Sequence, residues 1–139
     1  MSFFEVINPE ALGAPRGYSN GMLAPAGGRL LFVAGQIGWN TSQEIVGPDF
    51  VAQFDQALTN VIEVVRQAGG GAEHIGRLTM YVADKDEYAS VLPEVGGVYR
   101  RLMGRHFPAM ALVEVAALLE PGAKVEIEAT AVLPGEVSE

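Results

Sequence analysis

Residues 107–133, FPAMALVEVAALLEPGAKVEIEATAVL, read as two extended segments joined at the turn signal Pro121-Gly122. In the first segment, 108–118, Met110, Leu112 and Glu114 fall on one side of the chain and small apolar residues fall on the other. The second segment, 124–133, alternates throughout, with Val125, Ile127, Ala129, Ala131 and Leu133 against Lys124, Glu126, Glu128, Thr130 and Val132. A strand of period two turns one set of side chains to the core and the other to solvent, a cleft or a partner. We therefore expect these strands to carry the functional site.

Composition narrows the class of protein. The chain has 139 residues, which we interpret as a single domain, 1–139, long enough to bury a core. Its hydrophobic content is 49%, and part of that apolar surplus is expected to cover a subunit interface. The sequence contains no run of 18 or more apolar residues, so we expect no membrane span. The N-terminus has no signal-peptide pattern and the chain has no cysteine, which together predict a cytoplasmic protein. A net charge of −8 disfavours nucleic acid as a partner.

Periodicity and turn signals predict the order β-β-β-α-β-α-β-β. A short strand at 3–7 precedes a loop, and strands at 22–26 and 29–37 flank Gly27-Gly28, which we interpret as a hairpin. The remaining predicted elements are a helix capped by Asp49 and ended by Gly69-Gly70-Gly71, a strand at 75–82, and a helical region at 84–104 with a kink or late start near Pro93. Packing then predicts an α+β fold, an antiparallel-rich sheet with both helices on one face and its other face bare in a monomer.

Several motifs that would indicate other chemistry are missing from the sequence. The three glycines at 69–71 follow a helix and are not followed by Lys-Ser/Thr, so they predict a helix cap and not a phosphate loop. His74 and His106 stand apart, with no cysteine and no H-E-x-x-H pattern, so we predict no metal site. His106 is better interpreted as a cation at a helix end than as a general base. Ser19 has no G-x-S-x-G context, which argues against a nucleophilic hydrolase.

The two extended segments resemble the signature of the RidA/YjgF family of small enamine/imine deaminases, FPAR-x-x-VEV-x-x-L followed by VEIEA-x-AV. Residues 17–20, 31–37 and 79–82 are similar to that family's GPYS, LFVSGQI and TVYL blocks, in the right order along nearly the whole chain. The resemblance implies a chorismate-mutase-like fold and a homotrimer whose sheets face a central barrel, with clefts between subunits. It also implies a small-molecule imine as ligand and no cofactor.

By this resemblance, Glu126 matches the first glutamate of VEIEA, which helps to hold the hydrolytic water, so it is our candidate catalytic residue. The alternative is a solvated strand residue or one paired across the trimer. Tyr18 matches the cleft tyrosine of GPYS, or else packs a loop. Gly35 matches the glycine of SGQ, where a backbone amide can approach a ligand, or else marks a strand bulge. Glu114 matches the glutamate of VEV, for which a structural or interface role is favoured over catalysis.

The departures from the family pattern bear on specificity. Met110 stands where the family's carboxylate-binding arginine belongs, Ala34 replaces a serine, and Leu92 falls near an asparagine. A bidentate Arg–carboxylate pair is strong and directional, with hydrogen bonds to charged groups worth about 1.5–3 kcal/mol each. Losing that pair would weaken binding of a 2-imino acid by several powers of ten unless another cation compensates.

Arg16 and Arg105 are the candidate replacement cations. Met110 suits an apolar or aromatic ligand, or simply packs at the start of its strand. We expect Arg16, Tyr18, Gly35, Met110, Leu112 and Glu114 to contact the ligand. Two functions remain open: a deaminase of shifted substrate specificity that hydrolyses an enamine or imine in clefts between subunits, and a non-catalytic trimer that binds a small metabolite as a sensor or carrier.

Overall fold

The computed structural model describes residues 2–135, which form an α+β fold with a mixed sheet. Its elements in chain order are β1 (Glu5–Ile7), the 3-10 turn η1 (Glu10–Leu12), β2 (Gly21–Leu23), β3 (Arg29–Ile37), α1 (Phe50–Gln67), η2 (Ala72–His74), β4 (Ile75–Val82), α2 (Lys85–Ser90), α3 (Leu92–Met103), β5 (Ala109–Glu114) and β6 (Val125–Leu133). The predicted α+β class is thus confirmed, with one more helix than expected among these residues.

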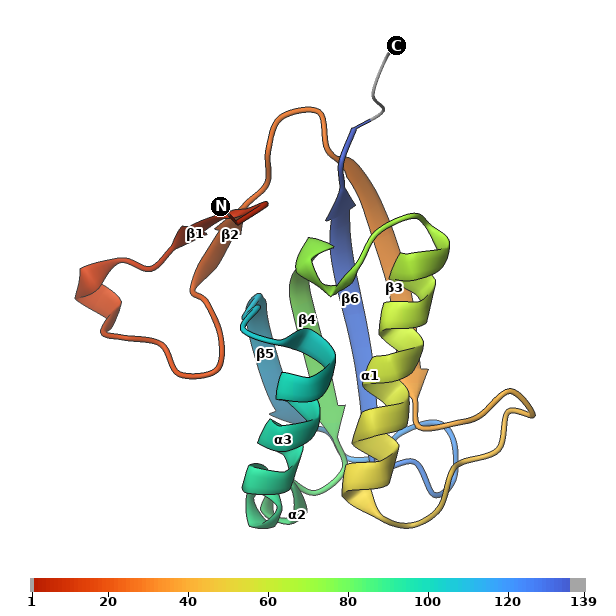
Figure 1. Ribbon diagram of the computed structural model, residues 1–139. Coiled ribbons are helices and arrows are strands. Elements are labelled where there is room, and N and C mark those ends of the chain that lie inside the picture. Colours follow the sequence, from red (N-terminus) through yellow and green to blue (C-terminus); the bar gives the residue numbers. More distant parts are fainter. Residues whose placement is uncertain (1, 136–139) are drawn as a thin grey trace.

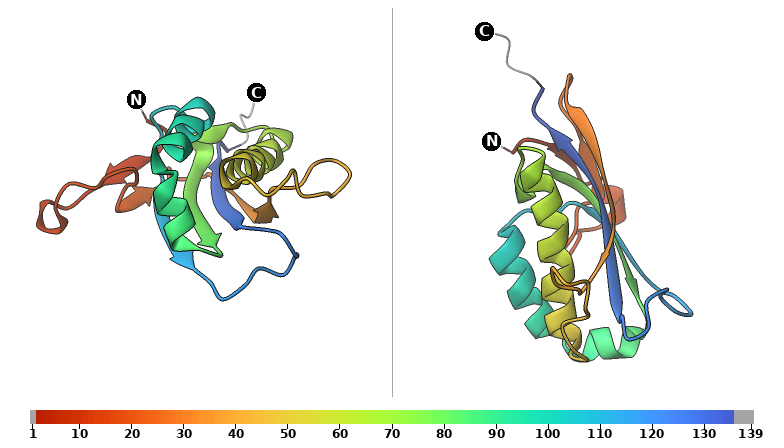
Figure 2. Two further views of the ribbon diagram at one scale, coloured as in Figure 1. Left: turned by 90° about the horizontal axis from the view of Figure 1, so that it is seen from below. Right: turned by 90° about the vertical axis from the view of Figure 1, so that its right-hand side faces the viewer.

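The four-stranded sheet has the order β3-β6-β4-β5. β6 lies in its centre and pairs antiparallel with both β3 and β4, while β4 and β5 are parallel. Helices α1 and α3 cover one face, and the side view in Figure 2 shows both of them on the same side of the sheet (Figures 1 and 2). The sheet is therefore mostly antiparallel with helices on one face, as the sequence predicted.

Alternation along β6 separates the two faces of the sheet. Val125, Ile127, Ala129 and Ala131 are buried and join the core under the helices. The residues between them, Glu126, Glu128 and Thr130, point to the uncovered face and are only half-buried. We call these surfaces the helix face and the open face. The predicted period-two pattern of this segment is confirmed.

Helix α1 supplies the centre of the core. Asp49 caps it, with its carboxylate accepting a hydrogen bond from the Ala52 amide at 2.9 Å. The helix ends just before Gly69, whose φ of 96° is the left-handed conformation that glycine tolerates best. Both predicted helix ends are confirmed.

The second helical region is divided in two. Pro93 falls in the first turn of α3, where its missing N–H breaks no helical hydrogen bond, and α2 ends just before it. The break expected near Pro93 is therefore confirmed, as a separation into two helices.

Two predicted strand arrangements are wrong. Gly27-Gly28 does not connect a hairpin, because β2 pairs with β1 and β3 pairs with β6. The chain instead leaves the small β1–β2 arm, which extends from the body in Figure 1, before it enters the sheet. The segment predicted as a strand over 108–118 is a strand only over Ala109–Glu114, where it pairs with β4. The turn signal at 27–28 did not determine which strands pair.

Within residues 2–135, no helix combines the length and the apolar character needed to cross a lipid bilayer.

Candidate functional site

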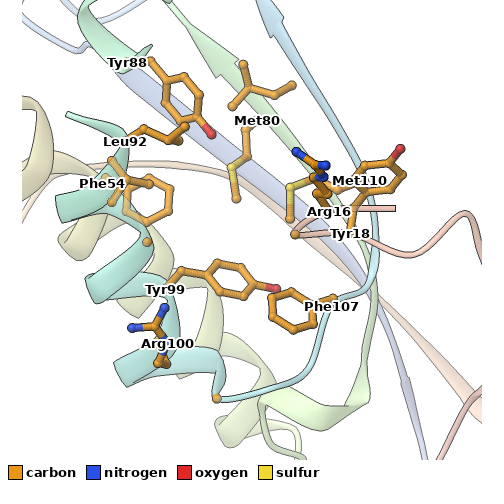
Figure 3. A pocket seen from close by; sticks show the side chains of 15 residues that line it. Arg16, Tyr18, Phe54, Met80, Tyr88, Leu92, Tyr99, Arg100, Phe107 and Met110 are labelled. Carbon is orange, nitrogen blue, oxygen red and sulfur yellow. The ribbon is translucent and has the colours of Figure 1, made fainter. Parts of the chain in front are cut away.

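A cavity of about 570 Å³ opens between α3 and the strands β4 and β5, on the helix face (Figure 3). Its walls are mainly aromatic and aliphatic, including Phe54, Met80, Tyr88, Leu92, Val95, Tyr99, Phe107, Met110 and Leu112. Small-molecule sites are commonly concave and mostly apolar, with volumes of roughly 300–1000 Å³. The size and lining of this cavity are typical of a ligand site.

The arm brings Arg16 and Tyr18 to one end of this cavity. Gly17, between them, has a φ of 76°, a conformation that bulkier residues rarely adopt. Ser19 fastens the segment to the body: its amide donates to the Pro108 carbonyl at 3.1 Å and its hydroxyl to the Phe107 carbonyl at 2.5 Å. Because this attachment lies at the start of β5, Arg16 and Tyr18 stand near Met110 (Figure 3).

The opposite wall consists of ordered aromatic rings. Tyr99 of α3 stacks on Phe107, with ring centroids 5.6 Å apart, and its hydroxyl donates to the His106 carbonyl at 2.6 Å. Burial raises the pKa of the Tyr99 phenol well above its ordinary value. Tyr88 packs edge-on against Phe50, and burial raises its pKa as well. Both phenols are therefore neutral near pH 7 and act as hydrogen-bonding groups without charge.

The charge around the cavity is positive although the chain is acidic overall. Arg16 and Arg100 line it, and none of its lining residues is acidic. Among the ion pairs within residues 2–135, none includes Arg16 or Arg100. Both arginines are exposed. The mouth thus offers cations to a ligand that carries negative charge.

Glu126 lies on the open face, away from this cavity. The register of β3 against β6 slips between Val33 and Gln36, so Ala34 and Gly35 form a bulge beside Glu126. A Cβ atom at Gly35 would lie only 2.5 Å from the Glu126 carboxylate oxygen Oε2. The bulge glycine therefore leaves room for this carboxylate, and a larger residue would displace it.

A second carboxylate on the open face is already engaged. The Tyr81 hydroxyl donates to Glu128 at 2.7 Å. This hydrogen bond is the main reason that the pKa of Tyr81 is raised, with desolvation and the negative charges of Glu128 and Glu126 adding to it. Glu126, in contrast, makes no side-chain hydrogen bond within residues 2–135, so its carboxylate is available to water or a ligand.

The sequence-predicted site residues fall into two groups on opposite faces of the sheet. Arg16, Tyr18, Met110 and Leu112 line the cavity on the helix face. Gly35 and Glu126 are together on the open face.

Three other residues considered from the sequence lie in neither group. Glu114, at the end of β5, accepts a hydrogen bond from the Lys85 amide at 3.0 Å, where α2 begins. Arg105 is exposed and does not line the cavity. His106, three residues after the end of α3, stacks on Phe4 and places Nε2 2.7 Å from the Ile75 carbonyl oxygen.

Sequence reasoning missed most of the cavity wall. Tyr88, Leu92, Val95 and Tyr99 come from the region predicted as helical, but nothing in their spacing shows that they face β5 across an open space. The available signal was the pair of tyrosines on this mainly apolar stripe, since a buried phenol needs a polar partner.

Within the part of the chain that the structure describes, no three His, Asp or Glu side chains are grouped so that they could hold a metal ion.

Comparison with known proteins shows which family the chain resembles. The family model described as endoribonuclease L-PSP matches residues 9–133. The 2-iminobutanoate/2-iminopropanoate deaminase of Capra hircus is 34% identical over 125 residues, which is 89% of this chain and 83% of the relative.

Solved structures resemble the fold closely. A Rid family protein of unknown function from Yersinia pestis, YyfB, is 36% identical with a TM-score of 0.83, covering 94% of this chain and 99% of that one. Escherichia coli TdcF with bound serine is 30% identical with a TM-score of 0.66, covering 88% and 92%. The chain therefore belongs to the endoribonuclease L-PSP family, which is the RidA/YjgF family whose motifs its sequence carries.

Proposed function

We propose that this protein is a deaminase of shifted substrate specificity. It hydrolyses an enamine or imine in clefts formed between the subunits of a homotrimer. Support comes from its membership of a family with imine deaminases among its relatives. The single observation that carries the proposal is the Glu126 carboxylate beside the Gly35 bulge, which makes no side-chain hydrogen bond within residues 2–135 and lies on the sheet face that α1 and α3 do not cover.

The need for more than one copy follows from where the residues lie. Glu126 and Met110 are on opposite faces of the same sheet, so one chain cannot direct both at one small ligand. A cleft that joins the Glu126 side of one subunit to the Met110 end of the next would bring the two groups together. The open face also exposes Leu30 and Phe32 at 65% and 76%, apolar surface that a neighbouring copy would cover.

The reaction needs only water and a positioned base. The carbon of a C=N bond is electrophilic, so water held by Glu126 adds to it while the carboxylate accepts a proton. That proton passes to the nitrogen, and the resulting carbinolamine collapses to a carbonyl and ammonia. Water and imine are thus converted into carbonyl compound and ammonia with no redox change.

Met110 is what shifts the specificity. It removes the cation that would pair with a substrate carboxylate, and the nearest replacement in the cavity is Arg16, held at the same end by the arm. An arginine on an exposed loop pairs less rigidly than one on a strand, because more of its freedom is lost on binding. Small 2-imino acids should therefore be poor substrates.

A non-catalytic function as a metabolite-binding trimer is the second candidate. The favouring observation is the cavity itself, which is large and apolar and lies apart from Glu126 within a chain. A binding protein would need the cavity but not the carboxylate.

The deciding experiment is a coupled assay with imines generated from a series of amino acids. The deaminase proposal predicts faster hydrolysis than in buffer for at least one imine, and no acceleration for any of them would leave only the binding function. Met110→Arg is expected to raise activity on 2-iminobutanoate, because it restores a carboxylate partner while Glu126 stays in place. An active parent whose Met110→Arg variant gains nothing on this substrate would show that position 110 does not set specificity.

A further inference from the structure

We infer that the cavity beneath α3 is a specificity pocket for a bulky aromatic or branched aliphatic group of an anionic ligand, whose negative charge is held at the mouth by Arg16. This inference deepens the proposed function, since it assigns the substrate class of the same site, and it rests on that site lying at Met110.

The first argument is the extent of the apolar lining of the cavity. Met110 and Leu112 of β5 lie on the core side of the sheet, and they line the cavity together with Met80 and Val95, which are 3% and 5% exposed. A ligand such as a two- or three-carbon acid would leave most of this volume to water in contact with apolar walls. Burial of an aromatic or branched group there releases that water and is favourable in proportion to area.

The second argument is the adaptability of the walls. Met80 and Met110 both direct flexible thioethers into the cavity (Figure 3). Methionine fills irregular space and makes favourable contacts with aromatic rings. An arginine at position 110 would instead place a charge at this entrance, so Met110 both removes the anion contact and extends the apolar wall.

The third argument is the small number of polar groups that remain. The Tyr99 hydroxyl donates to the His106 carbonyl, but the Tyr88 hydroxyl has no such partner within residues 2–135 and is directed into the cavity. At the mouth, Arg16 and Arg100 both carry a charge without an acidic partner in the same part of the chain, and Arg16 is the one beside Met110. An apolar chamber with a neutral hydroxyl inside and positive charge at its entrance matches an amphipathic anion.

Two adjacent glycines of α3 allow a matched test. Gly96 lines the cavity and Gly97 does not, and a Cβ at either position meets no atom within 4 Å. Leucine is a better helix former than glycine, so both Gly96→Leu and Gly97→Leu should fold. Only the first would put a side chain into the cavity.

The experiment is calorimetric titration of the purified protein with 3-phenylpropanoate, propanoate and 3-phenylpropan-1-ol, none of which can be hydrolysed as an imine. We expect 3-phenylpropanoate to bind at least about tenfold more tightly than either other probe, because only it uses both the chamber and the cation. Gly96→Leu should weaken its binding by tenfold or more, and Gly97→Leu should leave it unchanged. Arg16→Gln should weaken both acids but not the alcohol.

Equal binding of propanoate and 3-phenylpropanoate, no binding of any probe, or an unaffected Gly96→Leu variant would overturn the inference. Should Gly96→Leu fail to fold, Leu92→Trp obstructs the same cavity from a side chain that is already 49% exposed. The imine assay tests the deaminase proposal independently of these binding measurements. The expected binding pattern without turnover would remove the deaminase proposal alone, and turnover of small imines with a flat binding series would remove the specificity pocket alone.

Discussion

The two faces of the sheet are built from the same strands but differ in what completes them. On the helix face, Ile127 is fully buried beneath α1 and α3, so the chain satisfies this surface by itself. On the open face, Glu126 and Glu128 occupy the centre, and exposed apolar side chains such as Phe32 lie to one side. A surface with a polar centre and apolar surroundings cannot be a hydrophobic core, but it is suited to an interface with another molecule. The difference teaches that stability resides on one face and the candidate chemistry on the other.

The largest expected effect tests the chemistry of the open face. Glu126→Gln should lower kcat for any imine that the parent hydrolyses by about 10²–10⁴-fold, because the amide cannot accept a proton from water. Glu128→Gln is the matched control, two residues along the same strand and face, and it should change kcat little. Steady-state kinetics on both variants measures the effect. If Glu126→Gln is as active as the parent, then the base is another group.

The helix face should respond through stability instead. Ile127→Ala is expected to lower the free energy of unfolding by about 2–5 kcal/mol, because it leaves a cavity in a packed core. Urea denaturation followed by circular dichroism would measure it. Thr130→Ala, on the same strand but the other face, should cost far less. Similar losses for both variants would mean that the open face is packed as tightly as the core.

A charge introduced on the open face tests whether this face forms the trimer interface. Phe32→Asp should convert the proposed trimer into monomers, since it removes roughly 2 kcal/mol of apolar burial per subunit and places a carboxylate at the interface. Leu119→Asp is the control, because Leu119 is exposed on the loop between β5 and β6, away from the sheet. Sedimentation velocity would distinguish the two variants. A parent protein that sediments as a monomer would exclude the trimer and the proposed cleft with it.

The smallest effect concerns alkaline pH and the helix face. Burial raises the pKa of Tyr99 in the folded protein above its ordinary value of 10.0. Stability from this group is thus fully present below about pH 10 and is lost at higher pH, where the unfolded chain ionises first. Tyr99→Phe should flatten this loss above about pH 10 in urea denaturation, apart from a constant decrease for the missing hydrogen bond to His106. A parent and variant with parallel pH profiles would contradict it.

Local signals in the sequence were sufficient for most of the elements and for the two faces of β6. Strict alternation placed Ile127 inside and Glu126 outside, and Pro93 marked the division of the second helical region, because both features depend only on neighbours in the chain. The pairing of β3 with β6 joins residues about a hundred positions apart, so the glycines at 27–28 suggested the wrong partner. The cavity was missed for a related reason. It is the space between α3 and β5, and tertiary packing sets that space, not the local sequence.

The attachment of the arm has a consequence for any ligand at Met110. Ser19 joins the arm to Phe107 and Pro108 immediately beside the two residues, Arg16 and Tyr18, that the arm presents to the cavity. A molecule bound there touches both the arm and the body, so occupancy and docking of the arm reinforce each other by the same factor. Proteolytic cleavage near Arg16 should consequently slow as ligand occupies the site. The rate of cleavage in the arm would therefore measure how much of the site is occupied.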